Sequence, residues 1–430
     1  MPRKRVGLNV KPGNSFRGDI AAVLFPMVML IEISLIGRLF LTEILLVLSL
    51  PYLLSKRRWV ILQGDQKTLL IMGLCWLLAL MLSDVVMGTS FHDLSRGWSK
   101  IIFTMLDFIS IYLLTYKNPK RILLFVAGIA LGQVVKFFID PAPFAVASPW
   151  KFGLSGPITD LLIISAALLF KNGNKNQSVA VAMFGALLNI YLGARSVGAM
   201  SFLVALFVIL PEDLITRRNR LSKPLILAVF IFLLIGGTIL SKTYQYAVEN
   251  GYLGEAARET YEIQSSGKYG LLIGDRAELL AAVQAIKDSP VLGHGSWAKD
   301  PKYTYIMFDE LAELGYKVEI KARDLLDVRH GLIPSHSHLF GAWVEAGIAG
   351  AIFWIWVLYK IAKTFPLLVS LDSKFYPSLI LYHLVGFVWG ILFSPFGAED
   401  RVYAALDLVL MFFVWDSSRS ISQLMKKRVT

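Results

Sequence analysis

Residues 68–87 read TLLIMGLCWLLALMLSDVVM, an apolar run in which Asp84 is the only charged residue. Its length matches the roughly 20 residues that an α-helix needs to cross the hydrocarbon core of a bilayer. Over all 430 residues the apolar set AVILMFWYC makes up 56% and the charged set 17%, whereas soluble domains have roughly 45–50% and 25%. The run therefore predicts a membrane-spanning helix, and the composition predicts several more.

Similar apolar runs, bounded by charges, Gly or Pro, lie on both sides of this one and predict about 12 spanning helices. The runs cover 18–37, 38–54, 68–87, 101–116, 121–139, 157–170, 178–194, 196–211, 224–241, 339–360, 378–395 and 402–416. We therefore expect an all-α polytopic membrane protein in three parts. Residues 1–241 hold helices 1–9, residues 242–337 form a loop domain, and residues 338–430 hold helices 10–12 and a tail.

The loop of about 95 residues between the ninth and tenth helices is far longer than the others, and loops of that size are usually functional. Leu279, Leu280, Val283 and Ile286 recur at helical spacing. The predicted helix ends at Ser289-Pro290. The loop is therefore expected to be partly helical.

The charges follow the topology. Lys and Arg number 43 against 31 Asp and Glu, which gives a net charge of +12. A basic N-terminal tail and basic even-numbered connections place both termini in the cytoplasm and the long loop outside, as the positive-inside rule requires. This topology accounts for much of the excess charge, so we expect no nucleic-acid partner.

Cysteine and histidine usage bears on metals. The only cysteine, Cys75, lies in an apolar run and excludes a disulfide framework. His336 and His338 lack the i, i+4 spacing of a helical zinc site and have no cysteine nearby. We expect neither a metal nor another cofactor.

His336 and His338 directly precede the predicted tenth helix. A helix N-terminus disfavours the protonated imidazole, which favours a neutral ring able to act as a base. Either histidine is a candidate catalytic base. Ordinary surface histidines are the alternative interpretation.

Two arginines are candidates for anion binding. Arg195 lies among small residues between the seventh and eighth predicted helices, and Arg276 opens the predicted loop helix. Arginine at membrane depth is costly unless it faces a polar cavity or an anion, and two guanidinium groups can hold a diphosphate. An ion pair with a neighbouring carboxylate is the alternative for Arg276. Possible supporting residues are Arg96, Lys100 and Glu345.

The sequence carries, in order, Arg276, PVLGHG at 290–295, HS at 336–337, nine residues, and GIAG at 347–350. This arrangement resembles the hallmark of the O-antigen ligase and polymerase family of bacterial envelope enzymes. The setting of Arg195 and the predicted topology are similar to the family as well. Motif spacing places the family histidine at His336, although the second histidine, His338, departs from the commoner pattern.

The resemblance implies a GT-C-like fold and a metal-independent glycosyl transfer at the periplasmic face of the bacterial inner membrane. It implies a glycan donor on undecaprenyl diphosphate, with the lipid A-core oligosaccharide of lipopolysaccharide as the acceptor in the ligase branch. Arg195 and Arg276 would bind the diphosphate, and His336 or His338 would be the general base. The sequence does not specify the sugars or the oligomeric state.

Three alternatives remain open. An O-antigen polymerase uses a second lipid-linked glycan as acceptor, and a protein O-oligosaccharyltransferase uses serine or threonine. A flippase or transporter of lipid-linked glycans belongs to a different class and would use membrane-embedded charges such as Glu32, Asp107 and Asp160. Transfer without any gradient separates the enzymes from the transporter.

Overall fold

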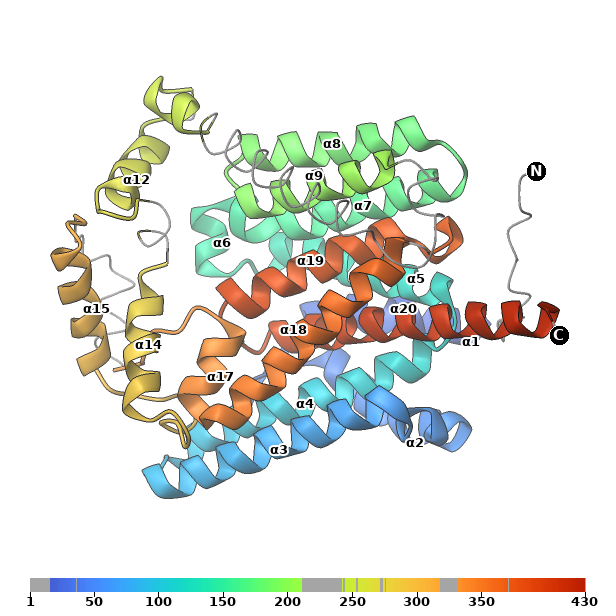
Figure 1. The fold of residues 1–430 in the computed structure, drawn as a ribbon, viewed down its shortest axis with the longest axis horizontal. Coiled ribbons are helices and arrows are strands. Elements are labelled where there is room, and N and C mark those ends of the chain that lie inside the picture. Colours follow the sequence, from blue (N-terminus) through green and yellow to red (C-terminus); the bar gives the residue numbers. More distant parts are fainter. Residues whose placement is uncertain are drawn as a thin grey trace.

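The computed structural model describes residues 16–35, 37–210, 242, 244–252, 254–270, 274, 276–317, 331–369 and 371–429. The protein is predominantly α-helical (Figure 1). Its first half contains α1 (Phe16–Met27), β1 (Glu32–Leu35), β2 (Gly37–Phe40), α2 (Leu41–Ile61), α3 (Gly64–Met87), α4 (Phe91–Thr115), α5 (Pro119–Ile139), α6 (Pro143–Ala147), α7 (Ser155–Lys171), α8 (Lys175–Tyr191) and α9 (Arg195–Ile209). Its second half contains α12 (Glu255–Ser265), α14 (Glu278–Asp288), α15 (Lys302–Glu313), α17 (His338–Ala346), α18 (Ile348–Val369), α19 (Pro377–Phe393) and α20 (Asp400–Val429).

Within these residues, five helices are long and apolar enough to cross a membrane. They are α3, α4, α5, α18 and the helical stretch Trp150–Lys171 that contains α7. The helices α9 and α19 are apolar but shorter. The chain is therefore a membrane-embedded helical protein. The predicted ninth span, 224–241, lies outside the described residues.

The prediction of one helix over residues 18–37 is wrong. The helix α1 ends at Met27, and β1 and β2 pair as an antiparallel hairpin before α2 begins. Gly37 has a φ of +91°, a conformation that side chains with a Cβ rarely adopt. The hairpin also brings the Arg38 Nε to 3.7 Å from a Glu32 carboxylate oxygen, so the two charges pair with each other.

The tenth predicted span, 339–360, is also divided. Gly347, with a φ of +62°, ends α17, and α18 begins at the next residue. The N-terminus of α17 is capped by Ser337, whose Oγ accepts a hydrogen bond from the Phe340 amide at 3.1 Å. The cap fixes the backbone beside His336 and His338.

Helices α12, α14 and α15 lie together beyond one end of the helical bundle, and the C-terminal end of α20 lies at the opposite end (Figure 1). The helix predicted around Leu279–Ile286 is confirmed as α14, with Ser289 as its C-cap. Buried Tyr303 and Met307 of α15 belong to the same apolar cluster as Ala282 of α14 and Val344 of α17. This second core joins α14 and α15 to the bundle.

Several basic residues pair between helices of the bundle. The Lys360 Nζ lies 2.9 Å from an Asp65 carboxylate oxygen, and an Arg419 Nη lies 3.2 Å from the same atom. The Lys171 ammonium donates to the Tyr376 hydroxyl at 3.1 Å. These contacts connect α3 with α18 and α20, and α7 with the residue before α19.

Candidate functional site

The two glycine-containing motifs of the sequence form one packing unit. We call residues 290–297 the strap. The His294 amide donates to the Val344 carbonyl at 2.7 Å, and the Gly295 amide donates to the Glu345 carbonyl at 3.0 Å. The strap therefore lies along the end of α17 through backbone hydrogen bonds.

Glycine is required where these two segments meet. Gly293 has a φ of +81°, and a Cβ added to it would lie 2.6 Å from the Glu345 carbonyl oxygen. A Cβ added to Gly347 would overlap the Val291 carbonyl. The spacing that the sequence analysis quoted as a family hallmark thus has a local physical cause, which is close backbone packing.

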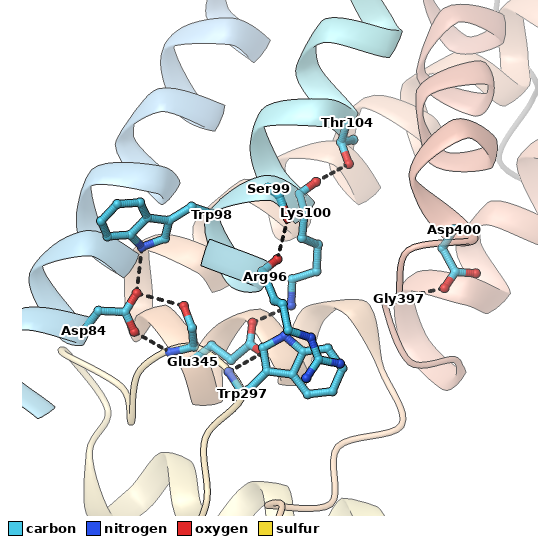
Figure 2. Close-up of polar contacts among 11 residues, drawn as sticks. Asp84, Arg96, Trp98, Ser99, Lys100, Thr104, Trp297, Glu345, Gly397 and Asp400 are labelled. Atoms are coloured by element: carbon cyan, nitrogen blue, oxygen red, sulfur yellow. Dashed lines mark hydrogen bonds and ion pairs between the residues drawn. The ribbon is translucent and has the colours of Figure 1, made fainter. Parts of the chain in front are cut away.

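Two carboxylates hold the end of the strap (Figure 2). Asp84, at the end of α3, accepts hydrogen bonds from the Ser296 amide at 2.6 Å, the Ser296 hydroxyl at 2.8 Å and the Trp98 indole at 2.7 Å. Glu345 accepts from the Lys100 ammonium at 2.5 Å and from the Trp297 amide at 3.3 Å. The strap is therefore tied to α3, α4 and α17 at once.

Of the three possible supporting residues, Lys100 and Glu345 form a direct ion pair between α4 and α17. The Arg96 guanidinium lies over the Trp297 ring, 3.4 Å from its centroid. Figure 2 shows all three residues gathered around Trp297. The structure thus brings the three together.

His336 is partly exposed and lies beside a carboxylate. Its Nδ1 is 3.2 Å from a Glu278 carboxylate oxygen, and 24% of the side chain is exposed. The neighbouring Ser337 hydroxyl donates to the Ile391 carbonyl at 2.7 Å. His336 therefore lies between the start of α14 and the last turn of α19, with the Glu278 carboxylate beside its ring.

His338 has a different environment. Only 4% of the residue is exposed, and its ring packs against Trp354 and Phe396 with centroids 5.1 and 4.8 Å away. No hydrogen bond of normal geometry reaches either ring nitrogen from the described residues, although the Pro395 backbone is near enough to favour protonation. Burial, followed by the charge of Lys100, lowers the pKa of His338 to about 3. His338 is therefore a neutral ring in an aromatic core.

Arg276 lies at the same end of α19 as His336. Its guanidinium carbon is 5.3 Å from the centroids of both the Trp389 and the Phe393 rings. Because Ser337 binds Ile391 between these two aromatic residues, the last turn of α19 contacts both segments. The structure thus brings the predicted base and one predicted cation to one helix end.

Arg195 is the first residue of α9, and its guanidinium lies over the Tyr244 ring, 4.5 Å from the centroid. Figure 1 shows that α9 begins and α19 ends at the end of the bundle where α12, α14 and α15 lie. Helices α9 and α19 also pack on each other. Arg195 is therefore at the same end as Arg276 and His336.

Sequence reasoning missed Ser296 and Trp297 and gave Asp84 no specific role. We call the hydrogen bonds that Asp84 and Glu345 accept from Ser296 and Trp297 the clamp. Its only signal in the sequence was a lone aspartate near the end of an apolar run. On and after α15, Tyr303 and Tyr316 are buried, whereas Tyr305 is 57% exposed. Throughout the part of the chain that the structure describes, no group of three His, Cys, Asp or Glu side chains is arranged to hold a metal ion.

No protein-family model matches this sequence, and no curated protein matches it either.

Proposed function

We propose that the protein is an inverting, metal-independent glycosyltransferase. Its reaction moves O-antigen glycan from undecaprenyl diphosphate to lipid A-core oligosaccharide at the periplasmic face of the bacterial inner membrane. One observation carries the proposal: the last turn of α19 contacts both the segment with His336, which lies beside Glu278, and the Arg276 guanidinium. A base and a cation for a leaving phosphate are the two groups that this displacement requires.

In the proposed reaction, His336 removes the proton from an acceptor hydroxyl as its oxygen attacks the anomeric carbon of the donor glycan. The bond from that carbon to the diphosphate oxygen breaks, and the diphosphate leaves with the electron pair. Arg276 and Arg195 stabilise the departing charge through charge-assisted hydrogen bonds. Glu278 stabilises the imidazolium, which then releases its proton to solvent. A single displacement inverts the anomeric configuration.

The environments of the two histidines favour His336 as the base. His336 is partly exposed and has a carboxylate within 3.2 Å, whereas His338 is buried among aromatic rings. A base must reach the proton that it removes and must have a pKa near the working pH. Burial lowers the pKa of His338 to about 3, so this ring is a poor proton acceptor.

The ligase and its two enzymatic alternatives share this site chemistry and differ only in the acceptor. One observation favours the different class, a proton-coupled transporter. Within the bundle, buried His383 lies between two carboxylates, with its Nδ1 3.2 Å from an Asp407 oxygen and its Nε2 3.7 Å from an Asp160 oxygen. Ionisable groups at membrane depth are common in transport, so the test must separate transfer from transport.

The test is glycosyl transfer by purified protein in detergent, with excess chelator and without any gradient. The substrates are undecaprenyl-diphosphate glycan and lipid A-core. We expect product from the unmodified protein and a loss of about 10²- to 10⁴-fold in His336→Ala, the usual contribution of a general base. His92→Ala, which alters a 65% exposed histidine side chain, is the matched control.

Transfer by a folded His336→Ala protein at the normal rate would contradict the proposed base. Elongation of the donor glycan, without transfer to lipid A-core, would identify a polymerase. Absence of any transfer, together with gradient-driven movement of the donor in vesicles, would identify a transporter.

A further inference from the structure

Arg96 is a partly buried arginine near the start of α4, before the predicted span 101–116. Among the described residues it stacks on Trp297 and interacts with the charge of Asp93 without forming a direct ion pair. The nearby carboxylates bind other donors: Asp84 binds Ser296 and Trp98, and Glu345 binds Lys100. The third, Asp93, binds Lys299 at 2.5 Å. Because these carboxylates already bind other donors, an anionic ligand group can accept charge-assisted hydrogen bonds from the Arg96 guanidinium.

We propose that Arg96 and Trp297 form an anion-binding subsite for a phosphate group of a membrane-anchored saccharolipid. The subsite rests on the proposed function, because it assigns a role in holding the acceptor. An arginine presents up to five N–H donors to a phosphate. The indole beside it adds an aromatic surface of the kind that packs against sugars.

The Trp297 ring forms a platform under Arg96, and specific hydrogen bonds hold the backbone around it in place. Trp297 has a φ of +51°, which is strained for a bulky residue. The strain is held by the bonds on either side of it: Ser296 binds buried Asp84 twice, and the Trp297 amide donates to Glu345. Strained residues held in this way cluster at ligand sites. The clamp thus fixes the indole against the guanidinium, 3.4 Å from CZ to the ring centroid.

The surroundings indicate a lipid-anchored ligand rather than a soluble one. The end of α3 and the start of α4 expose a group of apolar side chains: Val85 78%, Val86 58%, Met87 44% and Phe91 72%. An exposed apolar turn beside a membrane-spanning helix lies well in lipid. Arg96 is one to two helical turns from this group, within reach of phosphates at the headgroup level.

The subsite is separate from the groups proposed to bind the donor. Glu345 lies near the C-terminal end of α17, whereas His336 precedes its N-terminal end. The seven helical steps from His338 to Glu345 alone span roughly 10 Å along the helix axis. Arg276 contacts the last turn of α19, which lies on the His336 side of α17. The proposed phosphate subsite at Arg96 is therefore distinct from the arginines proposed to bind the diphosphate, and a saccharolipid bound at Arg96 extends toward His336.

The test is a binding measurement that requires no catalysis. Full-length protein in nanodiscs of phosphatidylcholine is titrated with bisphosphorylated lipid A, with its dephosphorylated form, with phosphatidylglycerol and with inorganic phosphate. We expect bisphosphorylated lipid A to bind the unmodified protein most tightly. Arg96→Ala weakens that binding by about tenfold or more, the usual effect of losing charge-assisted hydrogen bonds. Arg96→Lys weakens it less.

The matched control is Arg258→Ala, which removes the same charge from an exposed ion pair on α12 and leaves binding unchanged. Equal affinity for phosphatidylglycerol, equal affinity for dephosphorylated lipid A, or unchanged binding in a folded Arg96→Ala protein would each overturn the proposal. Preference for free inorganic phosphate would overturn it as well. If lipid A binds as expected but no glycosyl transfer occurs, the proposed function fails and the subsite remains.

Discussion

The clamp at Asp84 makes a sharp prediction about the strap. Asp84 is 2% exposed and accepts three hydrogen bonds, of which the Ser296 amide gives the shortest at 2.6 Å. Asp84→Ala removes the acceptor for that amide, for the Ser296 hydroxyl and for the Trp98 indole. The strap then loses its side-chain tie to α3, while the backbone bonds of His294 and Gly295 to α17 remain.

The magnitude follows from the bond that the amide loses. A hydrogen bond to a charged group contributes about 1.5–3 kcal/mol. If local opening of the strap governs exchange of the Ser296 amide, its hydrogen-exchange rate rises by about 10- to 150-fold in Asp84→Ala. Asp84→Asn keeps one acceptor oxygen, so the exchange rate of the Ser296 amide in this variant lies between the rates in the unmodified protein and in Asp84→Ala. The assay is hydrogen exchange read by mass spectrometry on peptides that cover 290–300.

Glu32→Gln is the control, because it alters a carboxylate that pairs with Arg38 and Lys136 in contacts of the hairpin. Peptides of the strap should exchange at the normal rate in that variant. Unchanged exchange at Ser296 in folded Asp84→Ala would refute the reasoning that the carboxylate holds the strap.

Three further predictions concern the aromatic surroundings of His338, the break between α17 and α18 at Gly347, and the contact between α14 and α15. His338→Phe retains transfer within about threefold, measured in the assay described above, because the ring packs among aromatic side chains and is not the proposed base. Gly347→Ala lowers the thermal unfolding temperature, because a Cβ there would overlap the Val291 carbonyl and because its φ of +62° with ψ of −154° costs a residue with a Cβ about 1–3 kcal/mol. Gly156→Ala, where a Cβ meets nothing within 4 Å, leaves the temperature unchanged or raises it, because alanine favours a helix more than glycine does. The hydrogen bond from Lys302, with a second from Tyr303, holds the pKa of Asp288 below its ordinary 3.8. The ionised Asp288 therefore contributes its full stabilisation to the contact between α14 and α15 above pH 3.8. This contribution is lost as the pH falls through the lower pKa of the folded state. Asp288→Asn should remove this acid sensitivity, as followed by protease cleavage between the two helices, and equal acid sensitivity in both proteins would contradict it.

The sequence by itself determined the helical membrane character, because each spanning helix must satisfy its own backbone within the bilayer and therefore shows as a long apolar run. It also located α14 and its end at Ser289, where helical spacing meets Ser289-Pro290. The sequence also showed Gly293 and Gly347 as parts of a motif. Glycine is needed at both positions because close backbone contact excludes any side chain with a Cβ.

Only the tertiary structure decided how these elements meet. The division at Gly347 depends on the strap, which is more than 50 residues earlier in the chain. The clamp joins Asp84 to Ser296, which is 212 positions later in the chain, and no local pattern records such a contact. The two candidate histidines are two residues apart in the sequence, yet one is beside a carboxylate and the other is buried among aromatic rings. Burial and partners are properties of the packed molecule, because they depend on side chains from α14, α18 and α19 that the local sequence does not contain.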